Sequence, residues 1–256
     1  MATKEQSVTL LRKNKRRQVE ELNALGFTGV SENTRASEFA DYIKWAGGLL
    51  DVTVAANRIS DNSKWYFTIE EWESLTSENK SRFVKRGVRV RAMCESFVVA
   101  TESPGSFVWA GTKKDVSTIP NYSADFANVG VYDDNKAYTY TKNIEDFFAD
   151  LSLNSPAASA ALAYRAFTYE LDGLDDDSKW ALPCVKHMLI MYRYFAEINE
   201  VIRRAWSTDF CLREEIIWTC IEDNVDYAWY FSLSDGTVNS AQKTTSYAIR
   251  PICVEL

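Results

Sequence analysis

The clearest pattern in the sequence is an alternation of large apolar and smaller or polar side chains near its C-terminal end. Every second residue of 227–233 is large and apolar, which predicts a strand with one covered face. Asp235-Gly236 follows it and predicts a hairpin turn, because glycine adopts positive φ at no steric cost. A returning strand is predicted at 247–252, and it should end at Pro251 or lie at a sheet edge, because proline lacks the N–H that a ladder needs.

Apolar residues spaced three and four positions apart predict helices elsewhere in the chain. Thr68 and Glu71 have the spacing of a capping box, which opens a helix through Trp72, with further helical turns expected up to Gly87. Ser155-Pro156 is typical of a helix start. The helical segments predicted from such patterns are 7–25, 31–50, 144–149, 155–169 and 183–204.

Four further strands are predicted in the first half of the chain. Residues 51–57 and 88–92 have strand patterns. Residues 97–100 and 107–110 flank a Ser-Pro-Gly turn, which predicts a second hairpin.

These elements predict an α+β protein with several domains. Residues 1–50 form an N-terminal helical attachment or oligomerisation segment that is too small to form a hydrophobic core of its own. Residues 51–142 form a small α+β middle domain and a linker, and residues 143–256 form the C-terminal domain.

Composition and charge narrow the class of protein. The 256 residues are 46% hydrophobic and 25% charged, which is typical of a soluble globular protein. The net charge is −7, and from residue 144 onward acidic residues outnumber basic ones by 18 to 9, which argues against nucleic acid as the main partner. No apolar run reaches the length of a membrane span, so membrane insertion is not expected. The first residues lack the apolar core of a secretory signal, so synthesis in a bacterial cytoplasm is expected.

The first helical segment carries both apolar and basic residues. Val8, Leu11, Leu22 and Leu25 fall on heptad-like positions, and five of the six residues 12–17 are basic. A solvated basic helix face explains the charges, and a docking or oligomerising helix explains the apolar positions as well. Nucleic-acid binding fits less well, because the basic run is short and has no interleaved aromatic residues. The heptad-like positions favour self-association, with a homotrimer as the expected state.

Four short motifs follow one another in the C-terminal part. They are Trp180-Ala181-Leu182-Pro183, Trp218-Thr219, Tyr227-Ala228-Trp229-Tyr230 and Ile249-Arg250-Pro251. This ordered set resembles the DUF1566 (Lcl) domain, a C-type-lectin-like family found in Bacteroidetes proteins and their phages. The resemblance covers residues 155–252 and implies a lectin-like fold with a binding role. The family usually has Trp-Ser-Ser-Thr where this chain reads Trp218-Thr219-Cys220-Ile221, so a site centred there departs from the family.

A second, shorter resemblance lies in residues 68–92. Thr-Ile-Glu-Glu-Trp, a short helix and Gly-Val-Arg-Val-Arg-Ala are similar to a segment of structural proteins from crAss-like phages of gut Bacteroidetes. The two resemblances imply the same host range.

Loops of lectin-like domains carry the binding face, so the resemblance implies a site at the β-hairpin and the loop before it. The side chains expected to contact a sugar by hydrogen bonds and stacking are Asp223, Asn224, Tyr230, Asn239 and Gln242. The alternative is that these are ordinary solvent-exposed loop residues.

Few residues in the sequence indicate catalysis or metal binding. His187, the one histidine, could share a helix face with Cys184, but no third orienting group accompanies them. Cys211 and Cys220 match the cysteine pair of the formylglycine-generating enzyme, a relative of the lectin-like fold, by position only. The acidic residues of 172–177 fit a solvated loop better than a calcium site. We therefore expect no catalytic residue, no metal and no cofactor.

The remaining polar and sulfur-bearing residues point to structural roles. The five cysteines are odd in number and show no C-x-x-C spacing, so reduced thiols are expected. Arg250 is expected to be a buried structural arginine paired with a carboxylate.

The leading hypothesis is a phage virion protein, a head or tail fibre or a decoration. Its N-terminal segment would attach it to other virion proteins or trimerise it, and its lectin-like domain would bind a host-surface glycan or protein. The alternative is a bacterial surface lectin or adhesin, which would need an export route.

Overall fold

The computed structural model describes residues 51–92, 95–121, 135–166, 178–207 and 216–254. The chain divides into two compact units, one of which holds residues 52–90 and 96–256. The other unit contributes only the ends of three strands to the described residues. Two sheets and six helices in the described residues confirm the predicted α+β class.

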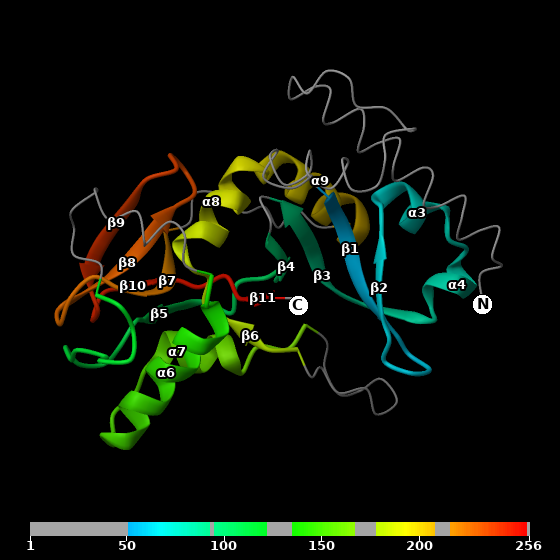
Figure 1. The fold of residues 1–256 in the computed structure, drawn as a ribbon. Helices are drawn as coiled ribbons and strands as arrows, with labels where there is room; N and C mark the ends of the chain where they lie inside the picture. Colours follow the sequence, from blue (N-terminus) through cyan, green and yellow to red (C-terminus); the bar gives the residue numbers. More distant parts are fainter. Residues whose placement is uncertain (1–50, 93–94, 122–134, 167–177, 208–215, 255–256) are drawn as a thin grey trace, which may run out of the picture. The chain divides into compact units, whose positions relative to one another are not determined.

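A six-stranded sheet combines strands from both ends of the chain (Figure 1). Its order is β2-β1-β3-β4-β11-β6. Central strand β4 pairs antiparallel with β11, so that Val98 lies opposite Cys253. The strands are β1 (Asp51–Arg58), β2 (Lys64–Phe67), β3 (Phe83–Ala92), β4 (Glu95–Val99), β6 (Trp180–Ala181) and β11 (Ile252–Val254).

A five-stranded sheet has the order β5-β10-β7-β8-β9. Strands β7, β8 and β9 form an antiparallel meander, whereas β10 lies parallel to β7 and antiparallel to β5. The hairpin predicted at Gly236 is confirmed, since this residue has a φ of 75° between β8 and β9. The strands are β5 (Ser106–Val108), β7 (Ile216–Glu222), β8 (Tyr227–Ser232), β9 (Val238–Gln242) and β10 (Ser246–Ala248).

One predicted hairpin and one predicted continuous strand are wrong, for one physical reason. Residues 97–100 and 107–110 do not form a hairpin, because β4 and β5 belong to different sheets. The strand predicted at 247–252 is divided between β10 and β11, also in different sheets. At both places the chain crosses from one sheet to the other, and the two crossings are joined by hydrogen bonds from Ala100 N to Pro251 O (2.9 Å) and from Ile249 N to Gly105 O (3.2 Å).

Each sheet contains strands from both sides of residue 142, where the sequence predicts a boundary between the middle and C-terminal domains. Strands β1 to β5 precede this position, and β6 to β11 follow it. The predicted boundary therefore divides both sheets.

Six helices complete the described residues. The capping box is confirmed, since Thr68 Oγ1 accepts from Glu71 N (3.2 Å) and Glu71 Oε2 accepts from Thr68 N (2.9 Å). The predicted helix at 183–204 is two helices that meet at Tyr194. The helices are α3 (Ile69–Ser74), α4 (Ser77–Lys80), α6 (Ala137–Asp150), α7 (Pro156–Leu162), α8 (Val185–Arg193) and α9 (Phe195–Trp206).

Gly87 does not end a helix as predicted but lies inside β3. A Cβ at this position would lie 2.5 Å from the carbonyl oxygen of Val99 on the neighbouring strand, so only glycine fits this approach. The strand pattern at 88–92 is confirmed, and it extends back to Phe83.

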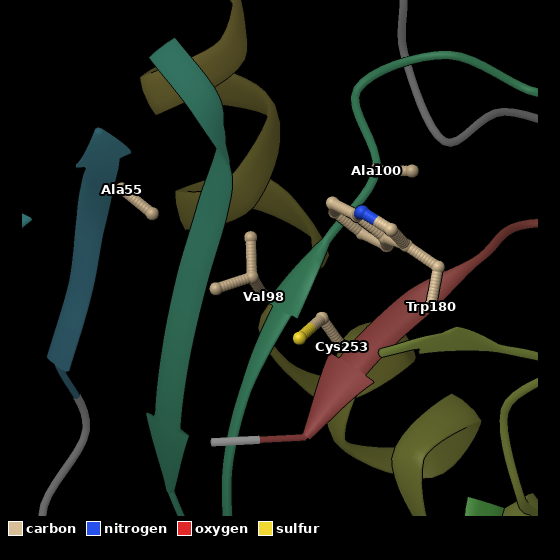
Figure 2. Close-up of a cluster of buried hydrophobic side chains, with 5 residues drawn as sticks. All are labelled: Ala55, Val98, Ala100, Trp180 and Cys253. Atoms are coloured by element: carbon tan, nitrogen blue, oxygen red, sulfur yellow. The ribbon is translucent and has the colours of Figure 1, made fainter. Parts of the chain in front are cut away.

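The core of the six-stranded sheet is closed around Trp180. Figure 2 shows its indole beside Ala100 and Cys253, with Val98 further from the ring and Ala55 at the far side of the cluster. Tyr164 packs edge-on against the indole with ring centroids 4.8 Å apart. The cluster consists of Ala55, Val98, Ala100, Trp180 and Cys253, each at most 3% exposed.

Among the described residues, no helix has the length and apolar character needed to cross a membrane.

Candidate functional site: an aromatic face on the five-stranded sheet

One face of the five-stranded sheet carries a row of aromatic side chains. Tyr230 on β8 lies opposite Trp218 on β7 and opposite Asn239 on β9, so the three side chains leave the sheet on the same side. On β10, Tyr247 lies opposite Phe107 of β5. These four residues, Phe107, Trp218, Tyr230 and Tyr247, are called the aromatic face.

Three of these rings contact one another. The ring centroids of Trp218 and Tyr247 are 4.8 Å apart, those of Tyr230 and Tyr247 are 5.1 Å apart, and those of Trp218 and Tyr230 are 6.4 Å apart. Trp218 is fully buried and donates from Nε1 to the Phe107 carbonyl at 3.0 Å, while both tyrosines are half-buried. The indole therefore forms the base of the face, and the tyrosines form its accessible part.

Polar groups surround the tyrosines. Asn239 is exposed, and its Oδ1 accepts from Ser240 N at 2.8 Å, which fixes the amide beside Tyr230. Burial raises the pKa of Tyr230, and the nearby Tyr247 and Asp235 raise it further. The Tyr230 phenol thus stays protonated at neutral pH and can donate a hydrogen bond.

The opposite face of the same sheet is closed by a helix. Tyr192 of α8 contacts Phe231 of β8 with ring centroids 5.8 Å apart, and Phe231 points away from Tyr230 because it is the next residue of the strand. Tyr192 also lies against the hairpin turn, where a Cβ on Gly236 would be 2.6 Å from its ring. The half-exposed tyrosines are therefore on the side that α8 leaves open.

A buried ion pair holds the loops at one end of this sheet. Lys243 and Glu222 are in direct contact, and both side chains are inaccessible to solvent. Lys243 Nζ also donates to the carbonyls of Lys114 (2.7 Å) and Val225 (3.1 Å), while Glu222 accepts from Val116 N at 3.0 Å. Burial raises the pKa of Glu222 and lowers that of Lys243, whereas their mutual attraction opposes both shifts.

No local pattern in the sequence predicts this ion pair. Lys243 follows the polar strand β9, and nothing in the sequence distinguishes it from a solvated lysine. Its role follows from three segments that the fold brings together, namely the chain before Val116, the end of β7 and the β9–β10 turn.

Of the five residues predicted to contact a sugar, the structure brings two together and places the other three elsewhere. Tyr230 and Asn239 lie side by side on the aromatic face. Gln242 lies opposite Tyr227 in the ladder and points to the other side of the sheet. Asp223 is buried, and its N–H donates to the Tyr227 carbonyl at 3.0 Å. The fifth residue lies in the loop between β7 and β8.

That fifth residue, Asn224, supports its own loop. Its Oδ1 accepts from the backbone N–H groups of Asp226 (2.9 Å) and Tyr227 (3.1 Å). An amide oxygen used in this way shapes the turn.

Sequence reasoning missed three members of the aromatic face: Phe107, Trp218 and Tyr247. Trp218 stands in a recognised motif and Tyr247 in a predicted strand, so their presence in β structure was visible. Their meeting depends on the parallel pairing of β10 with β7, which joins distant parts of the chain and leaves no local pattern.

Other predicted residues have structural surroundings or lie outside the described ranges. His187 is fully buried, its Nδ1 accepts from Cys184 N at 3.3 Å, and burial lowers its pKa to about 3. Arg250 is 1% exposed, with Nη1 lying 3.4 Å from the Ala100 carbonyl. The residues outside the described ranges are Val8, Leu11, Leu22, Leu25, Cys211 and the acidic residues of 172–177.

The chemistry of the aromatic face suits non-covalent binding. Half-exposed rings offer apolar surface, and the phenols and amide beside them offer hydrogen bonds. Within the ranges that the structure describes, no three His, Cys, Asp or Glu side chains gather as they would around a metal ion.

No family model matches the chain, and no curated protein matches it. One similar solved structure is a fimbrial protein from Bacteroides ovatus ATCC 8483, with a TM-score of 0.49 and 11% sequence identity. The match covers 88% of this chain and 46% of that one, so this chain spans about half of that protein's length. A likeness at this level does not establish a shared fold or function.

Proposed function

We propose that this chain is a phage virion protein, a head or tail fibre or decoration, whose C-terminal C-type-lectin-like domain binds a glycan on the host surface. It acts by binding rather than by catalysis. The aromatic face is the binding surface, and the observation that carries this proposal is the pair of half-exposed tyrosines resting on buried Trp218.

The physical argument rests on what a sugar presents to a protein. A pyranose ring has apolar C–H faces that stack on aromatic rings and hydroxyls that pair with polar groups at the ring edge. Tyr230 and Tyr247 supply the stacking surface and phenolic hydroxyls, and Asn239 supplies an amide in register with Tyr230. The virion setting comes from the resemblances of residues 155–252 and 68–92.

Binding measured by titration calorimetry tests the proposal. Purified full-length protein would first be applied to an array of bacterial capsular and surface polysaccharides, and the best ligand would then be titrated. Replacing Tyr230 or Tyr247 with alanine should weaken binding about tenfold or more, because each removes a stacking contact worth about 1.4 kcal/mol.

The matched control is Tyr227→Ala. Tyr227 is on the same strand as Tyr230, is 37% exposed and points to the opposite side of the sheet. This variant should bind like the unmodified protein. Equal losses for Tyr227→Ala and Tyr230→Ala, or no binding to any arrayed polysaccharide, would refute glycan binding by the aromatic face.

The attachment role belongs to residues 1–50, with Val8, Leu11, Leu22 and Leu25 as the apolar positions of a trimerising helix. Light scattering of the full chain should give the mass of a trimer, and a Leu11→Asp, Leu22→Asp variant should give that of a monomer. A monomer for the unmodified chain at all concentrations would contradict trimerisation.

The alternative, a bacterial surface lectin or adhesin, uses the same face. The two hypotheses differ in location, so antibody labelling of purified phage particles and of bacterial cells separates them. Label on particles favours the virion protein, and label on uninfected cells favours the adhesin.

A further inference from the structure

Two cysteines that lie 36 positions apart in the sequence meet inside the protein. Cys184 directly precedes α8, and Cys220 lies on β7. Their sulfur atoms are 3.2 Å apart, which is shorter than the optimum of roughly 3.5–4.0 Å for non-bonded heavy atoms. Both residues are 0% exposed, and the structure holds both as thiols.

The backbone on either side of the sulfur pair is fixed. Cys220 N donates to the Pro183 carbonyl at 2.9 Å, which joins β7 to the residue before Cys184. Cys184 N donates to His187 Nδ1 at 3.3 Å, which holds the first turn of α8. These hydrogen bonds hold the two segments beside one another, and a bond length of about 2.05 Å would bring the sulfurs about 1 Å closer than their present 3.2 Å.

We infer that Cys184 and Cys220 form a structural disulfide when the protein folds or opens in oxidising surroundings, with a small-molecule disulfide such as oxidised glutathione as the oxidant. This modification is independent of the proposed glycan binding. It would join the start of α8, which covers one face of the five-stranded sheet, to the strand that carries Trp218.

Oxidation of the two thiols by a small-molecule disulfide, RS–SR, takes place in two exchange steps. The thiolate of one cysteine attacks RS–SR, forms a mixed disulfide and releases one RS⁻. The second cysteine attacks the protein sulfur of that mixed disulfide, forms the Cys184–Cys220 bond and releases the second RS⁻. The two thiol protons end on the two released RS⁻ groups, so the protein loses two electrons and RS–SR becomes two RSH.

Burial determines when this reaction takes place. A site with no exposed surface has no room for a bulky mixed disulfide, so exchange proceeds in the unfolded or locally opened chain. Once closed, the same burial shields the bond from reductants. We therefore expect dithiothreitol to reduce the oxidised protein slowly in buffer and quickly in urea.

Peptide mass spectrometry tests the inference. Full-length protein refolded with reduced and oxidised glutathione would be alkylated without prior reduction and digested. The expected result is a peptide pair joining Cys184 to Cys220, about 2 Da lighter than the two thiol peptides together, which separates after reduction. Failure to find this pair in folded, oxidised protein, with both residues alkylated after urea is added, would overturn the inference.

A stability measurement gives an independent readout. The oxidised protein should unfold at a higher urea concentration than the reduced protein, because a link across 36 positions restricts the unfolded chain. This difference should vanish in Cys220→Ala and in Cys184→Ala. It should persist in Cys253→Ala, which removes a buried cysteine on β11 instead. A difference of the same size in Cys220→Ala would assign the effect to other cysteines and overturn the inference.

Discussion

The two sheets use their aromatic residues in different ways. In the six-stranded sheet, Trp180 is fully buried in a closed cluster of small and branched side chains (Figure 2), and the half-exposed Tyr66 and Tyr164 pack against this cluster. In the five-stranded sheet, Trp218 is equally buried, and the half-exposed Tyr230 and Tyr247 that cover it also contact each other, with ring centroids 5.1 Å apart. The closed cluster around Trp180 contributes to stability, whereas the paired rings of Tyr230 and Tyr247 form a continuous surface that a ligand can cover.

The largest effect is expected in the closed cluster. Trp180→Ala removes a side chain with no exposed surface and leaves a cavity, which should lower the free energy of unfolding by about 4 kcal/mol. Urea denaturation followed by circular dichroism measures this loss. Trp180→Phe, which retains most of the volume, should lose clearly less. A loss below about 1 kcal/mol for the alanine variant would mean that the cluster collapses around the gap.

A loss of nearly the same size is expected at the buried ion pair. Lys243→Met leaves the Glu222 carboxylate without its charged partner in a site closed to solvent, at a cost of about 3 kcal/mol. The double variant Glu222→Gln, Lys243→Met removes both charges, and the glutamine can still accept from Val116 N. It should recover more than half of the loss in urea denaturation. Equal stability of the single and double variants would refute an energetic coupling between the two residues.

A smaller, pH-dependent effect is expected from His187. The pKa of its imidazole is lowered to about 3 by burial, whereas in the unfolded chain it should be about 6.5. Between these values the unfolded state binds more protons than the folded state, so stability falls as pH falls below 6.5. The contribution lost between pH 7.5 and pH 5.0 is about 2 kcal/mol.

The control for this prediction is His187→Gln, whose side chain can still accept from Cys184 N. Urea denaturation at both pH values should give a drop that is smaller by about 2 kcal/mol in this variant. Parallel pH profiles for the two proteins would contradict a buried neutral imidazole.

The smallest effect is expected on the open aromatic face. Tyr247→Ala should lower the free energy of unfolding by about 1 kcal/mol, because the ring is already half-exposed in the folded protein. Urea denaturation of this variant beside Trp180→Ala tests the comparison between the sheets directly. A loss as large as that of Trp180→Ala would make the tyrosines part of the core and weaken the case for a ligand there.

Local patterns in the sequence determined much of the secondary structure. The capping box at Thr68, the alternating strand β8 and the hairpin at Gly236 were predicted because each depends on neighbouring residues alone. Residues with ambiguous local signals were less predictable. The two helices that meet at Tyr194 share one apolar spacing, so the sequence predicted a single helix.

The sequence by itself determined the α+β class, the strands around the hairpin and the presence of Tyr230 and Asn239 near one another. Only the tertiary structure decided which strands share a sheet, and it placed β4 beside β11 and β10 beside β7. Pairings between distant segments depend on which buried surfaces fit together, and a one-dimensional pattern does not record that choice. The aromatic face, the Glu222–Lys243 ion pair and the contact between Cys184 and Cys220 all arise from such pairings, which is why none of them could be derived from spacing along the chain.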